Sequence, residues 1–285
     1  MTLLQNTPCL LNDYDDGVRF STEASNIKIN VYASLENNVI SLTPDVVGKT
    51  TVTITINNKT FQVNINTIGV DVPNSLLLST KQKKQITVKG INGIKWNSSN
   101  SSVVSVSKNG TIYAKKTGNA VLMGTLGDLQ LGCVVSVVTP ARKRTVQKAI
   151  QIAKTCTYSQ PKRMQEKFYD CSSLVWKSYH KNGVNFGMAY YAPVAEDMGK
   201  WCVQHKKLVS GGLSQANIQN MKLNPGDVMF ETGQKNGRYK GIYHVEMITG
   251  YLFYGFDGNG KAELGIQWAT GDEKYYPMGQ MVGRP

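Results

Sequence analysis

The chain has 285 residues, of which 41% are hydrophobic and 18% charged, so it has the composition of a globular protein and enough length for two or three domains. No run of 18 or more apolar residues occurs, which argues against a membrane-spanning helix. The net charge of +13 suggests a polyanionic partner, and the absence of helix-turn-helix, zinc-finger and RRM patterns favours an anionic cell wall over nucleic acid.

The cysteines, at positions 9, 133, 156, 171 and 202, are odd in number and form no CxxC pair. This pattern argues against a disulfide scaffold and against a structural zinc site. We therefore expect no metal and no cofactor. The N-terminus shows no basic region followed by a long apolar core, so we expect no signal peptide in this chain.

The first 140 residues are typical of strands and turns. Alternating apolar and polar residues over 27–32 and 51–56 predict strands, and a further alternating run over 61–65 follows the turn pair Asn57-Asn58. Two such runs across a short polar turn predict a β-hairpin. We expect a degenerate Ig-like β-sandwich over residues 1–69.

An internal repeat with a period near 70 residues relates this segment to the next one. Gly48 falls opposite Gly118, and the apolar positions 61, 63, 65 and 68 fall opposite 131, 133, 135 and 138. The register holds for some twenty residues, which predicts a second β-sandwich over 70–139.

The second segment carries the string IKWNSSN (94–100), followed by VVSV (103–106), KNG (108–110) and IYA (112–114). This succession resembles the bacterial Ig-like modules of group 2, which in other proteins serve as spacers or as docking units. Trp96 is expected to be an aromatic residue of the core or its edge.

Residues 140–285 change character. Apolar residues at helical spacing predict an amphipathic helix over about 142–156, a second helix after Asp170 and a short one near 193–201. Several strands then follow, over 228–230, 243–250, 251–256 and 264–269. This order predicts an α+β domain in which a layer of helices packs on an antiparallel sheet.

Cys171 opens the second of these helices. Asp170 is a favourable N-cap, and Asn182-Gly183 ends the run. The unpaired N–H groups of a first turn favour an anion, so we expect a lowered pKa for the Cys171 thiol. The alternative is a buried cysteine that behaves as a small apolar residue.

Three pieces in order resemble the NlpC/P60 family of papain-like cysteine peptidases. They are DCSSLV (170–175), LNPGDVMF (223–230) and HVEMITG (244–250). The resemblance covers residues 140–285 and implies a papain-like domain. It implies that Cys171 is the nucleophile and that His244 is the general base.

The resemblance implies further roles. Gln267 is the residue we expect to orient the imidazole, with Asp257 and Asn259 as alternatives in a turn. Tyr158 resembles a tyrosine that shapes the oxyanion site. Asp170 and Ser172 match positions that contact a substrate amino terminus in some members. Glu246 shares a strand face with His244 and is expected to pair with the imidazolium or to narrow the cleft.

Two features depart from the family pattern. Tyr158 is followed by Ser159-Gln160-Pro161 and not by an aromatic residue and a Gly-Gly pair, and the insertion before Gln267 is long. A metal site formed by Cys171, His244 and Glu246 is an alternative on ligand type, although the helix-start thiol needs no metal to explain it.

The sequence thus predicts two all-β Ig-like sandwiches followed by an α+β papain-like domain. The resemblance implies hydrolysis of an amide bond in cell-wall stem peptides, often the bond after γ-D-glutamate, through an acyl-enzyme. We expect action at the bacterial cell wall, extracellular or virion-associated, as a phage endolysin or tail-associated lysin would act. The alternatives are a binding component of a phage tail or surface assembly with an inactive or masked peptidase-like domain, and an amidase or acyltransferase of the same fold.

Overall fold

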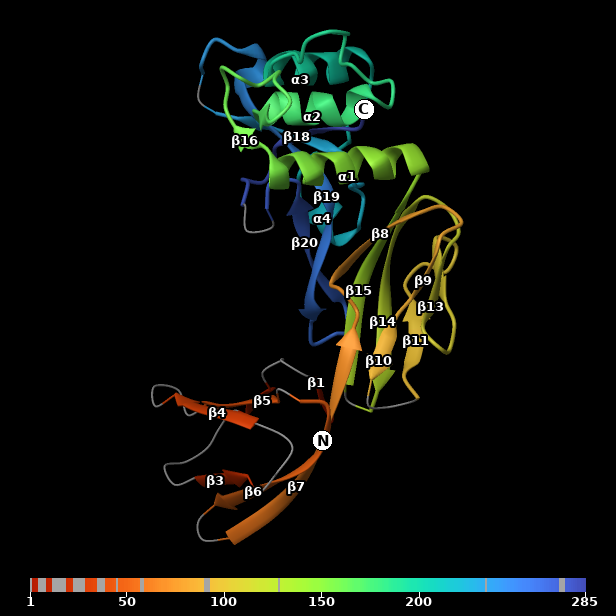
Figure 1. Cartoon of the computed structure of the whole chain (residues 1–285), viewed down its shortest axis with the longest axis vertical. Coiled ribbons are helices and arrows are strands. Elements are labelled where there is room, and N and C mark those ends of the chain that lie inside the picture. Colours follow the sequence, from red (N-terminus) through yellow and green to blue (C-terminus); the bar gives the residue numbers. More distant parts are fainter. Residues whose placement is uncertain are drawn as a thin grey trace.

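The computed structural model (Figure 1) describes residues 46–56, 59–89, 93–127, 129–233, 235–271 and 275–285, and the backbone of five strands within the first 45 residues. These five are β1 (Thr2–Leu4), β2 (Cys9–Leu11), β3 (Arg19–Thr22), β4 (Ile29–Ser34) and β5 (Val39–Pro44). The strand expected over 27–32 corresponds to β4 for its described part, and residues 27 and 28 lie outside the described residues.

The first segment is built around a long hairpin. Strands β6 (Gly48–Ile56) and β7 (Lys59–Asp71) pair antiparallel, as the alternating pattern predicts, and the turn pair Asn57-Asn58 lies outside the described residues. One sheet has the order β1-β7-β6-β3 and a second has the order β2-β5-β4. Strand β7 continues beyond residue 69 and pairs there with β10 (Thr87–Lys89) of the next segment.

The second module (70–139) repeats this hairpin. Strands β14 (Gly118–Leu126) and β15 (Leu129–Val138) pair with Gly118 opposite Val137, and Gly48 lies opposite Thr67 in the first hairpin. Gly118 and Val137 each lie 70 residues after their counterparts Gly48 and Thr67. The repeat seen in the sequence is therefore also a repeat of strand pairing.

Two sheets enclose the core of the second module. The first has the order β11-β14-β15-β8 and the second β12-β13-β9. The remaining strands are β8 (Ser75–Ser79), β9 (Lys83–Gln85), β11 (Lys95–Ser98), β12 (Val104–Val106) and β13 (Thr111–Ala114). Leu122 and Cys133 are fully buried between the sheets, and Trp96 packs against the edge of that core, as predicted.

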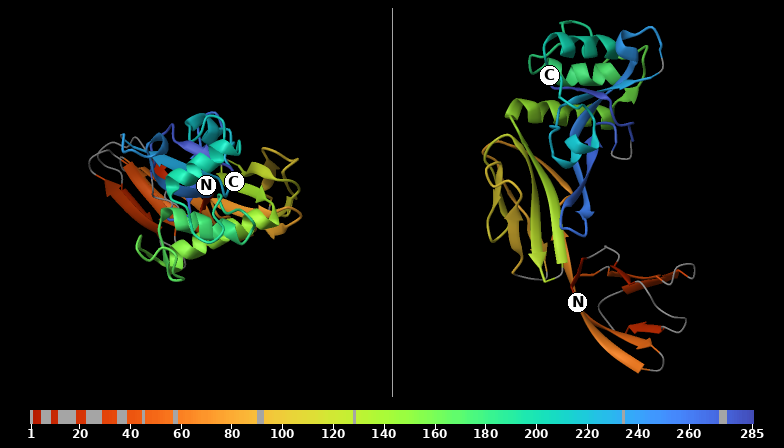
Figure 2. Two further views of the ribbon diagram at one scale, coloured as in Figure 1. Left: turned by 90° about the horizontal axis from the view of Figure 1, so that it is seen from above. Right: turned by 180° about the vertical axis from the view of Figure 1, so that it is seen from behind.

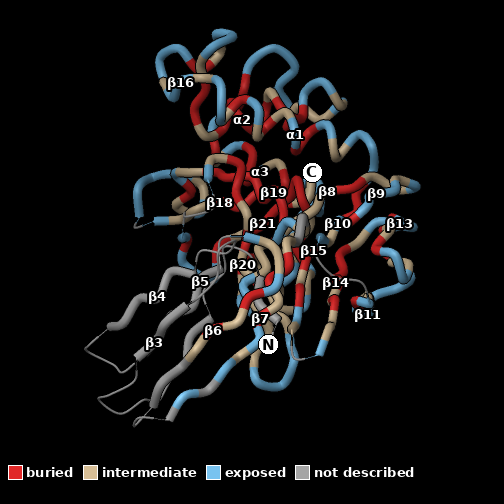
Figure 3. The backbone as a smooth tube through the Cα atoms, turned by 60° about the horizontal axis from the view of Figure 1, so that its bottom comes forward, coloured by how far each residue is buried: buried red, intermediate tan, exposed pale blue. Residues whose placement is uncertain are grey.

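The C-terminal part places helices on an antiparallel sheet. The sheet order is β20-β19-β18-β21, and buried residues gather where α3, β18 and β19 meet (Figure 3). The longer elements are α1 (Pro140–Thr155), α2 (Cys171–His180), α3 (Ala195–Gln204), β18 (Val228–Thr232), β19 (Ile242–Phe256) and β20 (Ala262–Trp268). The shorter ones are β16 (Thr157–Tyr158), β17 (Phe168–Tyr169), α4 (Gln215–Gln219), the 3-10 turn η1 (Tyr239–Gly241) and β21 (Met281–Gly283).

Alternation along β19 explains this layering. Val245 and Met247 point to the side of α1, α2 and α3, where they share a core with Leu174. Ile248 and Tyr251 belong to a second core on the other side of the sheet. The predicted arrangement of a helix layer on an antiparallel sheet is therefore present in residues 140–285.

The second core joins the C-terminal part to the second module. Val121 and Val134 of β14 and β15 are buried in the same cluster as Tyr251. The β19–β20 hairpin accordingly runs alongside the second module, as the view from behind shows (Figure 2). The two units share buried apolar surface and are not connected by a chain segment alone.

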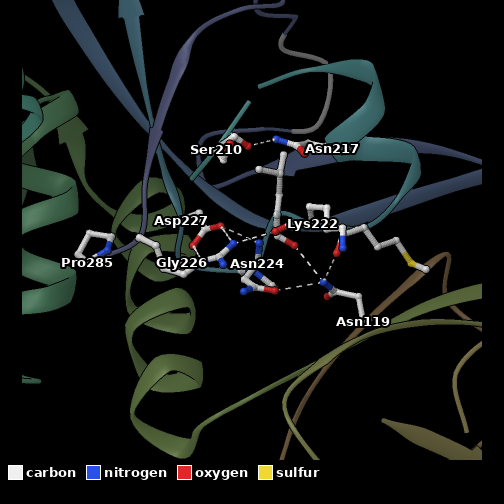
Figure 4. Close-up of polar contacts among 12 residues, drawn as sticks. Asn119, Ser210, Asn217, Lys222, Asn224, Gly226, Asp227 and Pro285 are labelled. Carbon is white, nitrogen blue, oxygen red and sulfur yellow. Dashed lines mark hydrogen bonds and ion pairs between the residues drawn. The ribbon is translucent and has the colours of Figure 1, made fainter. Parts of the chain in front are cut away.

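Polar contacts at the same junction are shown in Figure 4. The Asn119 carboxamide donates to the carbonyl oxygens of Met221 and Leu223 at 3.0 and 2.9 Å. Asp227 is fully buried and accepts from Arg142 and Arg284, each at 2.7 Å. Its carboxylate also accepts from the Asn224 N–H at 2.8 Å, so Asp227 caps the turn before β18.

None of the helices in the described part of the chain is long and apolar enough to cross a membrane.

Candidate active site

Cys171 lies in the first turn of α2, where the sequence predicts it. The Asp170 carboxylate accepts from the Ser173 N–H at 2.8 Å, and the Ser173 hydroxyl accepts from the Asp170 N–H at 2.8 Å. This reciprocal capping box fixes the start of the helix. It also holds the Cys171 side chain, which is partly buried, at the floor of a cleft.

The electrostatics of this thiol differ from the sequence-based expectation. Burial, and then the negative charge of Asp170, raise the pKa of Cys171 above its ordinary value. Hydrogen bonds from the Val245 and Ser172 backbone and from the Tyr158 hydroxyl act in the opposite direction. The expected lowering by the helix start is therefore outweighed, because the capping residue is itself an anion beside a desolvated thiol.

His244 lies near the beginning of β19 and faces the same cleft. It pairs in register with Glu231 of β18, so two neighbouring strands present an imidazole and a carboxylate side by side. The cleft has a volume of about 460 Å³. It is lined by Cys171, His244, Glu231, Gln160 and four tyrosines, Tyr158, Tyr243, Tyr275 and Tyr276.

Tyr158 lies beside Cys171 because of a short parallel strand pair. In that pair, between β16 and β17, Tyr158 is opposite Tyr169, two residues before the cysteine. The Tyr158 side chain is half exposed, and its ring packs edge-on against Tyr169 with centroids 5.5 Å apart. Burial and the neighbouring Cys171 and Asp170 raise the pKa of its hydroxyl, so Tyr158 is a neutral donor at the thiol.

Gln267 does not lie beside His244. In the β19–β20 pair it is opposite Gly250, where an added Cβ would meet both the Gln267 side-chain oxygen and the Ser75 hydroxyl. Gly250 follows His244 by six positions on one strand, which corresponds to about 20 Å. The prediction that Gln267 orients the imidazole is wrong, because the register pairs Gln267 with Gly250 and bonds the Ala269 N–H to the Met247 carbonyl, so the part of the chain nearest His244 follows Trp268.

The alternatives for that role are also remote. The Asp257 carboxylate accepts from the Asn259 and Lys261 N–H groups at 2.9 and 2.8 Å. Both Asp257 and Asn259 therefore belong to the turn that the sequence predicts for them.

Tyr276 occupies the place expected for an orienting residue. Its hydroxyl is 3.3 Å from Nε2 of His244, and the two rings lie nearly parallel, at 21°. Trp268 packs edge-on against the Tyr276 ring with centroids 4.8 Å apart. Sequence reasoning missed this residue because Tyr276 lies outside every periodic element, and its only signal is the aromatic pair before Pro277.

Glu246 does not line the cleft. It is 2% exposed, and its carboxylate accepts from the Thr270 hydroxyl at 2.6 Å and from the Met247 N–H at 3.0 Å. The expectation that Glu246 narrows the cleft is therefore wrong, because its side chain is buried and does not line the cleft. The carboxylate instead faces the Tyr276 hydroxyl.

Asp170 and Ser172 are likewise closed to a substrate amino terminus. Asp170 is 4% exposed, and its second oxygen forms a 3.0 Å ion pair with Arg163. Ser172 is 1% exposed. Arg163, which the sequence does not single out, also donates to the carbonyl oxygens of Ala192 and Pro193, so it ties the loop before α3 to the start of α2.

No cluster of three or more His, Cys, Asp or Glu side chains suited to a metal ion occurs among the described residues. The cysteines at 133, 156, 171 and 202 are free thiols.

Residues 73–135 match the family model of the bacterial Ig-like domain (group 2). This match confirms the resemblance inferred from the string at 94–100. We therefore refer to the second module as the Ig-like module. The match does not extend into residues 140–285, and no curated protein matches the chain.

Three solved structures that match this chain each cover less than half of it. Invasin, a bacterial integrin-binding protein, is 12% identical, with 43% of this chain and 31% of that chain covered and a TM-score of 0.24. Domains 4 and 5 of the S-layer protein SbsC are 18% identical, with 43% and 77% covered and a TM-score of 0.20. The I9–I11 tandem from titin is 12% identical, with 48% and 62% covered and a TM-score of 0.21.

Proposed function

We propose that this chain hydrolyses an amide bond by thiol chemistry at Cys171 and His244. The observation that carries the proposal is their meeting in one cleft, with the thiol at the start of α2 and the Tyr158 hydroxyl in hydrogen-bond contact with it. The resemblance of residues 140–285 to NlpC/P60 peptidases supports the same chemistry.

In the first step, His244 takes the proton of the Cys171 thiol, and the sulfur attacks the amide carbonyl carbon. Since Nε2 of His244 faces Tyr276, Nδ1 is the nitrogen that receives this proton. The negative charge on the carbonyl oxygen is stabilised by the Cys171 N–H and the Tyr158 hydroxyl.

In the second step, the imidazolium returns its proton to the departing amine, the C–N bond breaks and a thioester remains on Cys171. A water molecule, deprotonated by His244, then attacks the thioester. This attack releases the carboxylic acid and restores the thiol, so that protons balance over the cycle.

The substrate we propose is the stem peptide of the bacterial cell wall. The net charge of +13 favours an anionic matrix, and residues 141–285 alone carry 20 basic and 11 acidic residues. The Ig-like module would hold the cleft at the wall or within a phage tail. Action at the cell wall, extracellular or virion-associated, follows from this proposal.

The test is mass spectrometry of purified muropeptides incubated with the full chain and with Cys171→Ala. We expect shorter peptides with the first protein and none with the second, and their masses would identify the bond. Intact muropeptides from several wall types, with a folded protein, would contradict the proposal.

A second candidate is a binding role in a surface or phage assembly, with a masked cleft. The raised pKa of Cys171, caused first by burial, favours an unreactive thiol in the isolated chain. Alkylation separates the two candidates: reaction of Cys171 at neutral pH far faster than that of free cysteine supports the hydrolase, and equal or slower reaction supports the masked site.

A further inference from the structure

We propose that Tyr276 positions the His244 imidazole and that Glu246, acting through the Tyr276 hydroxyl, stabilises the protonated ring. This inference rests on the proposed thiol chemistry of the cleft. It assigns a relay of three side chains, His244, Tyr276 and Glu246, in the place where a single orienting residue was expected at Gln267.

The first element of the relay is the fixed position of the Tyr276 ring. The ring is mostly buried, lies nearly parallel to the imidazole and packs edge-on against Trp268. Its hydroxyl is held 3.3 Å from Nε2 of His244. Because two aromatic neighbours fix the ring, the hydroxyl has little freedom to turn away from the imidazole.

The second element is the direction of the hydrogen bonds. Both oxygens of Glu246 already accept, from Thr270 and from the Met247 N–H, as the oxygens of a carboxylate do. The Tyr276 hydroxyl also bonds to this carboxylate, so its proton points to Glu246. The phenolic oxygen is then an acceptor for the Nε2–H of His244.

The consequence is a defined tautomer. With the proton on Nε2, Nδ1 carries the lone pair that takes the proton of Cys171. The buried charge of Glu246 lies one hydroxyl group away and favours the imidazolium once it has formed. A neutral phenol thereby transmits the effect of a carboxylate that is itself covered from substrate.

Other titratable groups also face His244. Cys171 comes from α2, Glu231 from β18, Tyr158 from β16, Tyr243 and Glu246 from β19, and Tyr275 and Tyr276 from the segment before β21. Glu231 is a second acidic side chain in this group, so its contribution must be separated from that of Glu246.

The experiment measures iodoacetamide alkylation of Cys171 by peptide mapping at pH 6 and at pH 9, without any peptide substrate. The variants are Tyr276→Phe, which keeps the ring, and Glu246→Gln. Tyr254→Phe, on the exposed part of β19, is the matched control, and Glu231→Gln tests the other carboxylate.

We expect the ratio of the rate at pH 6 to the rate at pH 9 to fall about tenfold in Tyr276→Phe and Glu246→Gln, because about one pKa unit of imidazolium stabilisation is lost. The control should keep the wild-type ratio. Glu231→Gln should change the ratio less than Glu246→Gln does. A merely structural role would lower the melting temperature or both rates without changing their ratio.

An unchanged ratio in Tyr276→Phe would overturn the proposal, and this variant decides alone if Glu246→Gln does not fold. The readout needs no wall peptide. A relay-dependent ratio in a protein that leaves muropeptides intact would therefore refute the proposed hydrolysis and support the relay.

Discussion

At the scale of single residues, the cleft contains two tyrosine hydroxyl groups with different surroundings. Tyr158 is half exposed and lies at the thiol, whereas Tyr276 is buried and lies at the imidazole. The first is placed to meet a developing negative charge on substrate. The second is placed to hold a proton on a ring nitrogen, so their removal should have different kinetic signatures.

Tyr158→Phe should lower kcat on the wall peptide by about 100-fold and leave KM nearly unchanged, because an oxyanion donor acts in the transition state. Steady-state kinetics on a purified muropeptide would measure both constants. Tyr190→Phe, at a fully exposed tyrosine outside the cleft, is the control. A rise in KM at constant kcat would instead indicate that Tyr158 only binds substrate.

At the scale of elements, the start of α2 depends on one buried ion pair. Asp170→Ala would leave Arg163 buried without its partner and would remove the helix cap. We expect the free energy of unfolding to fall by about 3–5 kcal/mol. Urea unfolding would measure this loss. Asp197→Ala, an exposed carboxylate in the first turn of α3, should cost less than about 1 kcal/mol.

The core of the Ig-like module should make stability fall at alkaline pH. Burial raises the pKa of Cys133 to about 12. Above pH 9 the unfolded thiol loses its proton while the folded one keeps it, so unfolding becomes easier as pH rises up to about 12. In Cys133→Ala this part of the slope, about 1.4 kcal/mol per pH unit, should disappear.

Unfolding curves of Cys133→Ala and wild type between pH 8 and pH 11 would measure this difference. Parallel losses of stability in the two proteins would show that Cys133 does not titrate on unfolding. The lower absolute stability expected of the variant, from the lost side-chain volume, does not affect the comparison of slopes.

Local patterns predicted several of these elements well. The N-cap at Asp170, the hairpin repeat and the Trp96 string are all set by neighbours in the sequence. Tyr276 and Arg163 could not be predicted in the same way, because each acts through contacts that join distant segments. Gln267 was misplaced for a related reason: the register between β19 and β20 decides which residue lies near His244, and the alternating pattern does not reveal that register.

At the scale of the whole molecule, the Ig-like module and the C-terminal part share the apolar cluster that contains Val121, Val134 and Tyr251. A side chain at Gly132 on β15 would overlap the Phe253 ring on β19. Gly132→Val should therefore destabilise the full chain by about 1–3 kcal/mol. Phe253→Ala in the same chain should recover part of the loss, since it removes the overlapping ring.

Thermal unfolding of the two single variants and the double variant would give the coupling between these sites. Gly255→Ala, on β19 where an added Cβ meets nothing, is the matched control. Additive effects of Gly132→Val and Phe253→Ala would show that β15 and β19 do not pack together in solution.

The shared core limits the positions that the cleft can take relative to the Ig-like module. A flexible tether would let the cleft explore a volume set by linker length, with a low local concentration of targets. Here Asn119 donates to the Met221 and Leu223 carbonyl oxygens, and Val121 and Val134 share a core with Tyr251, so the Ig-like module is held against the sheet that carries His244. A partner that binds the Ig-like module would therefore also fix the distance and the orientation of the cleft relative to that partner's surface.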